Sequence, residues 1–360
     1  MGTFKNNTKA SILSREISHF HNRGEAIAGK IQTVLNSIRE VGIRHLKELN
    51  QEKVQEIVQE IAERVENGEI KPNTGATYIS ALNEIIDYTN YHFNKEIEQI
   101  HYSDYFSKSI DYADKSISNE VHENFQNFLE QKFEQTGDER FQALQYATEL
   151  QREFGLRFRE SVGLNQETIS RALETNKLEL GREDWTKNAR EREIEVRTES
   201  QRELLQEVKN FLENQNTTNL AGAQDWKSYS EIASFRSFAD YQRQEFSSSA
   251  GEQYNFHGER HAWAQERYSE LWQEKTGVSI QAPIQYYSSE LEKIGWNGED
   301  MKFYEAVREH EIKSWFEYTK EETGLDIKEI KEIDKEIRQE ISEQLGHSRI
   351  DITNTYLGHA

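Results

Sequence analysis

The residues of this sequence that are best suited to covalent chemistry lie near its end, where Leu345-Gly-His347 precedes Tyr356. His347 and Tyr356 are separated by 356 − 347 = 9 positions. A tyrosine phenol has an ordinary pKa of about 10 and is a poor nucleophile at neutral pH. Attack by Tyr356 on a phosphodiester would therefore need a nearby base, together with cations that stabilise the phenolate as it forms.

Two upstream segments hold arginines that could supply this positive charge. They are Phe154-Gly-Leu-Arg-Phe-Arg-Glu-Ser161 and Phe256-His-Gly-Glu-Arg-His-Ala-Trp-Ala264. A phosphoryl group in transfer passes through a crowded, doubly charged state, which two guanidinium groups can clamp through paired N–H···O bonds. Arg157 and Arg260 fit that role, and Arg159 is the alternative within the first segment.

Taken in order, these segments resemble the sequence boxes of the tyrosine recombinase (phage integrase) family. The boxes are Gly-Leu-Arg-x-x-Glu, then His-x-x-Arg-His, then Leu-Gly-His with the nucleophilic tyrosine nine residues after its histidine, and the resemblance covers residues 119–358. It implies that Tyr356 cuts DNA through a 3′-phosphotyrosyl bond, and that His257 and His347 contact phosphate oxygens or assist proton movement. Because that bond stores the energy of the broken linkage, no metal, nucleotide or other cofactor is expected.

A further segment, Thr186-Lys-Asn-Ala-Arg-Glu-Arg-Glu-Ile194, resembles the β-hairpin of the family, whose lysine would be Lys187. The departing 5′-oxygen of DNA needs a proton, and a lysine near phosphates can deliver one while adding positive charge. Lys187 is therefore the candidate general acid, and Lys177 is the alternative.

The sequence departs from the family pattern in three places. Gly258-Glu259 stands where the second box more often has Asp-Leu, so the geometry of that helix start is open. Many more residues than usual separate Arg260 from His347, which predicts an extra helical insertion at about residues 276–331. Only Leu357-Gly-His-Ala360 follow Tyr356, so we expect this tyrosine to be mobile without DNA.

The elements that must position these residues are mostly helices. Apolar residues recur at helical spacing from Ile27 through Val34, Leu35 and Ile38, again over residues 54–65, and again over residues 74–91. This pattern predicts a small helical, SAM-like core-binding domain over residues 1–116. A polar stretch near residues 111–119 is the candidate linker.

The second predicted domain, residues 119–360, is the catalytic domain, with the DNA breaking-rejoining fold that the resemblance implies. Short strand patterns occur at Lys177-Leu-Glu-Leu180 and Arg192-Glu-Ile-Glu-Val196, and helical patterns follow at residues 204–212, 262–272, 303–316 and 327–341. The predicted fold class is thus mainly α with a small antiparallel β-sheet.

Composition bears on the possible partners. With 360 residues and 35% hydrophobic residues the chain can bury a large core, and without cysteine it has neither disulfides nor a thiolate nucleophile. No apolar run is long enough to cross a bilayer, so we expect a cytoplasmic protein with no membrane partner. The net charge of −21 argues against nucleic-acid binding, although a local basic face can coexist with acidic surfaces elsewhere.

By resemblance, the expected partners are double-stranded DNA recombination sites, bound by a homotetramer, with an accessory directionality factor as a further possibility. The predicted function is site-specific recombination that integrates or excises a mobile genetic element. Two alternatives stay open: a recombinase that resolves DNA dimers, and a catalytically silent DNA-binding protein of the same fold, which the negative charge would favour.

Overall fold

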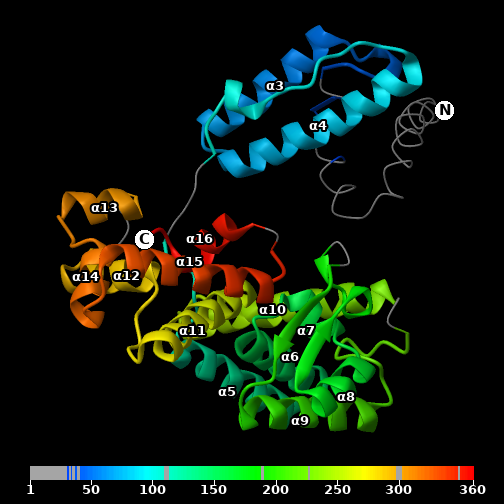
Figure 1. Cartoon of the computed structure of the whole chain (residues 1–360). Coiled ribbons are helices and arrows are strands. Elements are labelled where there is room, and N and C mark those ends of the chain that lie inside the picture. Colours follow the sequence, from blue (N-terminus) through cyan, green and yellow to red (C-terminus); the bar gives the residue numbers. More distant parts are fainter. Residues whose placement is uncertain are drawn as a thin grey trace. The chain divides into compact units, whose positions relative to one another are not determined.

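The computed structural model describes residues 31, 34, 37–38, 41–108, 113–187, 190–225, 228–296, 302–347 and 349–360. The chain divides into two compact units, Met1–Asp111 and Tyr112–Ala360. Helices predominate, and the described residues contain one two-stranded antiparallel sheet (Figure 1). This confirms the predicted class. Ile27 and Leu35, from the first predicted helix, lie outside the described residues.

The first unit is built around a pair of helices, α3 (Gln51–Glu66) and α4 (Pro72–Phe93), with short 3-10 turns at Leu46–Glu48 and Tyr102–Asp104. The Asn50 side chain accepts a hydrogen bond from the main-chain N–H of Lys53 and caps α3. Pro72 occupies the first turn of α4, where its missing N–H does no harm. The two helices pack against each other through apolar faces that repeat with helical spacing.

The second unit contains the remaining elements, which alternate helices with the single sheet. Their bounds are α5 (Asn119–Thr136), α6 (Arg140–Phe154), α7 (Phe158–Gly163), α8 (Gln166–Thr175), β1 (Lys177–Leu180), β2 (Arg192–Glu195), α9 (Glu199–Gln215), α10 (Tyr229–Ala250), α11 (Phe256–Thr276), α12 (Pro283–Lys293), α13 (Phe303–Glu309), α14 (Trp315–Thr323), α15 (Ile327–Gln344) and α16 (Asn354–Leu357). Strands β1 and β2 pair antiparallel, with Leu178 opposite Ile194 and Leu180 opposite Arg192. Both predicted strands are therefore present.

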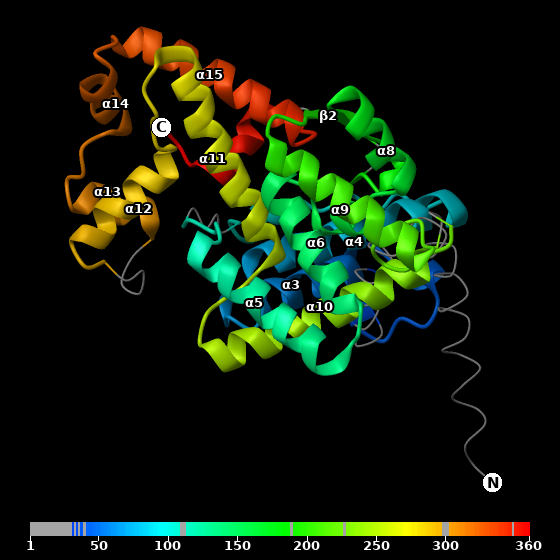
Figure 2. The ribbon, with the colours of Figure 1, turned by 90° about the horizontal axis from the view of Figure 1, so that it is seen from below.

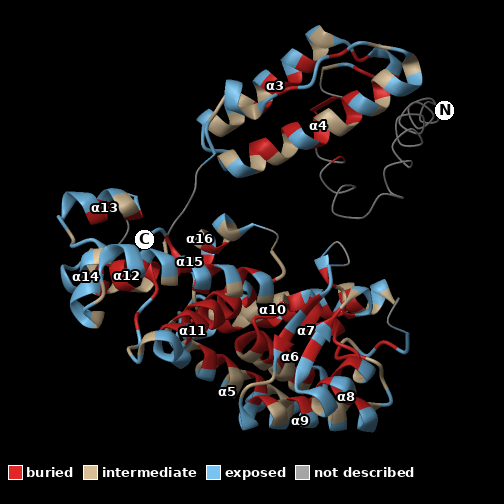
Figure 3. Cartoon of the chain, viewed as in Figure 1, coloured by how far each residue is buried: buried red, intermediate tan, exposed pale blue. Residues whose placement is uncertain are grey.

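Helix α11 is the centre of this unit. It packs against α6 on one side and against α15 and α16 on another (Figures 1 and 2). Buried residues follow much of its length, as they do on α6 (Figure 3). Phe256, at its start, belongs to the hydrophobic cluster of the residues before it, whereas Trp263 and Trp272 belong to the cluster formed with α12 to α16. The helix thus joins two cores.

The predicted insertion at residues 276–331 contains α12, α13, α14 and the first turn of α15. The helical pattern expected over residues 303–316 is two helices rather than one, because the chain turns between them and Glu311 adopts a left-handed φ of 51°. Trp315, Tyr287 and Leu291 share a hydrophobic cluster with Tyr356. The inserted helices are therefore packed into the core that supports the end of the chain.

The stretch proposed as a linker also differs from expectation. Ile117 is 5% exposed and belongs to the core of the second unit, where its N–H donates to the carbonyl of Gly258. No helix in the described part of the chain has the length and apolarity needed to span a membrane.

Candidate active site

Tyr356 lies on α16 with only 4% of its surface exposed. Its hydroxyl is 3.3 Å from Nε of Arg260, which donates to it, and 3.4 Å from Nε2 of His347. Leu357 beside it is fully buried and α16 packs on α11 and α12, so the structure packs Tyr356 into the unit. The mobility of Tyr356 without DNA stays a prediction. The phenol thus meets a cation and an imidazole, the two groups that its activation requires.

The two predicted arginines converge on one point. Nη2 of Arg260 donates to the main-chain carbonyl of Leu345 at 2.6 Å, and Nη2 of Arg157 reaches the same oxygen at 3.4 Å. Arg260 is fully buried, and burial with the charges of Arg157 and Arg192 lowers its pKa to about 10. Arg157 has 24% of its side chain exposed and forms the solvent side of the pair.

Gly155 explains how the chain brings Arg157 to this place. It ends α6 with a left-handed φ of 60°, and a Cβ there would lie 2.5 Å from the ring of Trp263. Only glycine tolerates both the torsion and the close approach. The carbonyl of Gly155 accepts a hydrogen bond from Nη1 of Arg260, so the turn before Arg157 is tied directly to the second arginine.

Glu160 forms ion pairs with two arginines of the site, Arg157 and Arg192. It accepts a hydrogen bond from Nη1 of Arg157 at 2.8 Å and two from Arg192, at 2.9 and 2.6 Å. Burial alone would raise the pKa of Glu160, but hydrogen bonds from Arg192 and the charges of Arg192, Arg260 and Arg157 lower it to about 2. Glu160 is the glutamate of the first sequence box, whereas Arg192 was not predicted as a site residue.

Three imidazoles surround Tyr356. The ring centroids of His257 and His347 each lie 5.7 Å from that of Tyr356, and the centroid of His261 lies 4.6 Å from it. Burial and the nearby arginines lower the pKa of His257 to about 4 and that of His347 to about 3. Burial and the neighbouring His257 and Lys115 lower that of His261 to about 3. All three rings are neutral at pH 7, and their lowered pKa values make them weaker bases than an exposed imidazole.

His261 was not predicted as a site residue, although it is the last residue of the His-x-x-Arg-His box. It is 2% exposed, and its buried Nε2 has no hydrogen-bond partner among the described residues. Its position directly after Arg260 on a helix is the sequence feature that could have identified it as a site residue.

Lys187 is not gathered into this cluster. It lies on the exposed loop between β1 and β2 and makes no hydrogen bond or ion pair with another described residue. The two alternative residues are engaged elsewhere. The guanidinium of Arg159 stacks over the rings of Trp185 at 4.5 Å and Tyr229 at 4.9 Å, and Lys177 pairs with Glu193 at 2.8 Å.

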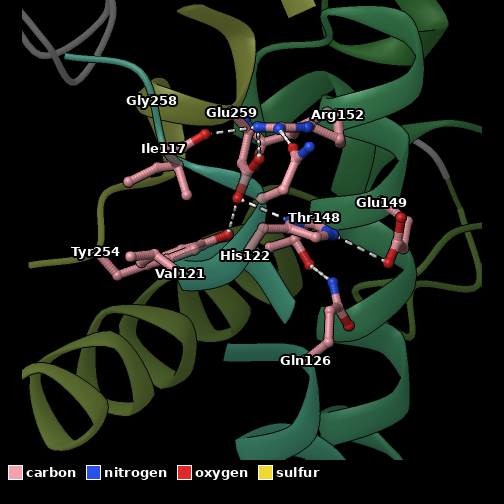
Figure 4. A network of polar contacts seen from close by, with 12 residues as sticks. Ile117, Val121, His122, Gln126, Thr148, Glu149, Arg152, Tyr254, Gly258 and Glu259 are labelled. Carbon is pink, nitrogen blue, oxygen red and sulfur yellow. Dashed lines mark hydrogen bonds and ion pairs between the residues drawn. The ribbon is translucent and has the colours of Figure 1, made fainter. Parts of the chain in front are cut away.

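A buried ionic network lies beside the start of α11 (Figure 4). Glu259, fully buried, accepts hydrogen bonds from Nδ1 of His122 at 2.9 Å, the hydroxyl of Tyr254 at 2.8 Å and Nη1 of Arg152 at 3.2 Å. Burial alone would lower the pKa of His122, but its hydrogen bonds to Glu149 and Glu259 raise it to about 9. Glu259 departs from the family box, and its carboxylate fixes the turn of α11 that carries Arg260.

An open groove of about 700 Å³ adjoins the site between β2 and the end of α15. Arg190, Arg192 and His347 line it, but glutamates outnumber the arginines: Glu191, Glu193, Glu195, Glu340 and Glu343. Such a lining repels phosphates.

Comparison with known proteins agrees with this geometry. A family model described as Integrase matches residues 111–266, the part of the chain that carries Arg157 and Arg260. This match covers less than half of the chain, and it agrees with the resemblance of the sequence boxes to tyrosine recombinases. No curated protein matches this chain.

The fold of this chain is similar to a solved structure of the Tn1549 transposon integrase. That structure holds a fragment with a tyrosine-to-phenylalanine substitution, in complex with transposon right end DNA. The TM-score is 0.52 at 12% sequence identity, and the match covers 98% of this chain and 95% of that one. At this identity the likeness concerns the fold.

Proposed function

We propose that this protein is a tyrosine recombinase that cuts and rejoins DNA at specific sites, with Tyr356 as nucleophile, and integrates or excises a mobile genetic element. One observation carries the proposal: Arg157 and Arg260 point their Nη2 atoms at one oxygen, and Nε of Arg260 also donates to the hydroxyl of Tyr356. A non-bridging phosphate oxygen at that point would receive hydrogen bonds from both guanidinium groups. This is the arrangement that stabilises a doubly charged phosphoryl transition state.

The first chemical step follows from the neighbours of the phenol. The oxygen of Tyr356 forms a bond to phosphorus as the bond from phosphorus to the DNA 5′-oxygen breaks. The phenolic proton passes to a neutral imidazole, with His347 the nearest at 3.4 Å and His257 the alternative. Arg260 stabilises the developing phenolate through Nε. Rejoining reverses these transfers.

The proton for the departing 5′-oxygen is assigned to Lys187. Its exposed loop leaves the ammonium group available to DNA, whereas Lys177 is already paired with Glu193. This assignment requires the loop that carries Lys187 to approach the phosphate when DNA binds.

The proposed partner is duplex DNA with paired recombination sites, held by a homotetramer in the cytoplasm. An accessory directionality factor is a further proposed partner. The Tn1549 integrase was solved with DNA, which supports the first of these. The acidic groove between β2 and α15 suggests that DNA runs across the arginine side of the site instead.

A nicked suicide substrate tests the proposal. Such a duplex, built from inverted repeats in the DNA that flanks the gene, loses a short product on cleavage and traps the covalent complex. Wild-type protein should form an adduct that denaturing electrophoresis detects, and Tyr356→Phe should form none. Tyr241→Phe is the matched control, because Tyr241 is 63% exposed and lies outside the site.

The alternatives have distinct outcomes in the same assay. Tight, specific binding without any adduct would identify a silent DNA-binding protein and overturn the enzymatic proposal. An adduct that persists in Tyr356→Phe would overturn the choice of nucleophile.

A further inference from the structure

Gln265 makes a contact that the chemistry above does not use. This side chain, on α11, is only 1% exposed. Its Nε2 donates to the main-chain carbonyl of Tyr356 at 3.2 Å and to Oδ1 of Asp114 at 2.9 Å. One amide group therefore joins the backbone of the nucleophile to a residue at the opposite end of the unit in sequence.

Asp114 belongs to a docked segment, residues 114–117, that is fixed firmly to the start of α11. Oδ1 of Asp114 also accepts the N–H of Ser116 at 2.9 Å. The N–H of Ile117 donates to the carbonyl of Gly258 at 3.3 Å, and the carbonyl of Ile117 accepts Nη1 of Arg152 at 2.8 Å (Figure 4).

Gly258 permits this docking. A Cβ at that position would lie 2.6 Å from Cγ1 of Ile117 and 2.7 Å from the carbonyl oxygen of Lys115, so any larger residue would push the segment away. Together with the ion pair of Arg152 and Glu259, this close packing makes residues 114–117 a fixed reference point rather than a loose strand.

The helix that carries Tyr356 needs a fixed contact of this kind. Helix α16 spans only Asn354–Leu357, a single turn that does not hold itself in place. Arg338 also contacts this segment, because its Nη1 donates to the side-chain Oδ1 of Asn354 and to the main-chain carbonyl of Gly358, which follows the helix. A displacement of about 1 Å in the reacting groups can slow a reaction about a hundredfold. The hydrogen bond from Gln265 to the carbonyl of Tyr356 therefore matters most.

We propose that Gln265 is a positioning residue, which fixes the main chain of Tyr356 relative to the docked segment at Asp114. The inference rests on the proposed role of Tyr356 as nucleophile. The docked segment is also where the chain enters the second unit, just after the division at Asp111.

The test compares Gln265→Leu with variants of its partner. At saturating suicide substrate, Gln265→Leu should cleave about tenfold more slowly, with a DNA dissociation constant within about twofold of wild type. Asp114→Leu should also slow cleavage, whereas Asp114→Asn keeps an oxygen acceptor and should restore most of the rate. In the Asp114→Leu background, Gln265→Leu should cost clearly less than in wild type.

Hydrogen exchange of the DNA-free protein gives a readout that does not need catalysis. Amides of residues 353–358 should exchange faster in Gln265→Leu and Asp114→Leu. They should be unchanged in Gln273→Leu, a matched control on the same helix whose side chain contacts only the carbonyl of Gly277. If wild type forms no adduct, the proposed function fails while this comparison still decides the bridge.

Two results would overturn the inference. One is a Gln265→Leu protein with wild-type cleavage and wild-type exchange at residues 353–358. The other is full additivity of Gln265→Leu and Asp114→Leu, because independent residues do not form a bridge.

Discussion

At the scale of single residues, the site places one phenol beside imidazole and guanidinium groups whose protonation states at pH 7 suit the activation of that phenol. Neutral imidazoles of His257, His261 and His347 can accept its proton, while Arg157 and Arg260 stay cationic because a guanidinium does not lose its proton near neutral pH. The base and the electrostatic stabiliser that the proposed role of Tyr356 needs are therefore present together at pH 7.

Arg260→Lys tests the need for a planar fork. Lysine keeps the charge but cannot contact Leu345, Gly155 and Tyr356 at once, as Arg260 does. We expect the single-turnover cleavage rate to fall by about a hundredfold or more. Arg140→Lys, on an exposed side chain of α6, is the control and should cleave normally. Equal rates in the two variants would contradict the clamp.

The three imidazoles also predict how stability depends on pH. Their pKa values fall from 6.5 in the unfolded chain to about 4 for His257 and about 3 for His261 and His347. Between pH 6.5 and these values the unfolded chain binds more protons, so the free energy of unfolding decreases as pH falls through this range. Above pH 6.5 their contribution is complete.

Urea unfolding measured at a series of pH values checks this, and His261→Gln should reduce the slope below pH 6.5. A slope that is unchanged in this variant would show that His261 does not titrate as described.

The sequence predicted the residue types of the site better than their contacts. Arg260, His257 and His347 lie beside Tyr356, and Arg157 shares the carbonyl of Leu345 with Arg260, because spacing within each box follows helix and turn geometry. The catalytic roles of these residues stay a prediction. Arg192 and Gln265 gave no such signal, since their roles depend on contacts with Glu160, Asp114 and Tyr356 that only folding creates.

At the scale of elements, α11 carries both the site and its support. Glu259 faces the ionic network while Arg260 and His261, the next two residues, face Tyr356. Successive helical positions differ by about 100°, so one turn can serve both sides. The orientation of Arg260 thus depends on a carboxylate that never touches the reacting atoms.

Glu259→Gln is expected to lower the free energy of unfolding by about 3 kcal/mol, because it leaves His122 and Arg152 without their buried anion. It should also weaken the rise in the pKa of His122, so that stability depends less on pH between 6.5 and 9. In wild type this contribution is present below pH 6.5 and is lost as pH rises through 9.

Chemical denaturation at pH 7 and pH 9 measures both effects. Glu245→Gln, which removes a partly exposed pair with Lys132, is the control and should change stability by less than about 1 kcal/mol. A similar loss in the two variants would mean that the network adds nothing beyond a surface pair.

Gly155→Ala is expected to destabilise the second unit by about 1–3 kcal/mol, because it combines a left-handed φ with a clash against Trp263. Gly137→Ala shares the left-handed torsion, with φ of 66°, but has open space around the added methyl. Thermal unfolding of the two variants separates strain from packing. If both lose the same stability, the contact with Trp263 is unimportant.

Helical periodicity predicted α3, α4, α11 and α15 because each has a long apolar face. It was less useful for α10, whose 22 residues include many serines and charged side chains and bury only Ile232, Phe235, Ala239, Gln242 and Phe246. The break between α13 and α14 depends on a left-handed turn at Glu311, a residue with no local preference for it.

At the scale of the whole molecule, the main tension is between a net charge of −21 and a DNA substrate. Part of that excess lies on α15 and in the groove beside β2, where glutamates gather. The arginine cluster keeps a local positive charge, because Arg157 and Arg192 share the carboxylate of Glu160.

Binding to duplex DNA should therefore depend steeply on salt despite the negative total charge. We expect affinity to fall by about a thousandfold between about 50 mM and about 200 mM salt, as it does for proteins that contact several phosphates. Fluorescence anisotropy with a labelled duplex measures this. A flat dependence would indicate that phosphate contacts are few and would count against the proposed function.

The main-chain carbonyl of Leu345, which both arginines share, has a consequence for selectivity. A peptide oxygen carries only a partial charge, so it occupies the space between the two guanidinium groups without neutralising them. Chloride or free phosphate must compete with an acceptor that the chain itself tethers, at an effective concentration that dissolved ions seldom match. A duplex presents many phosphates at once. We therefore expect DNA to displace this carbonyl oxygen from the two arginines and small ions to leave it in place.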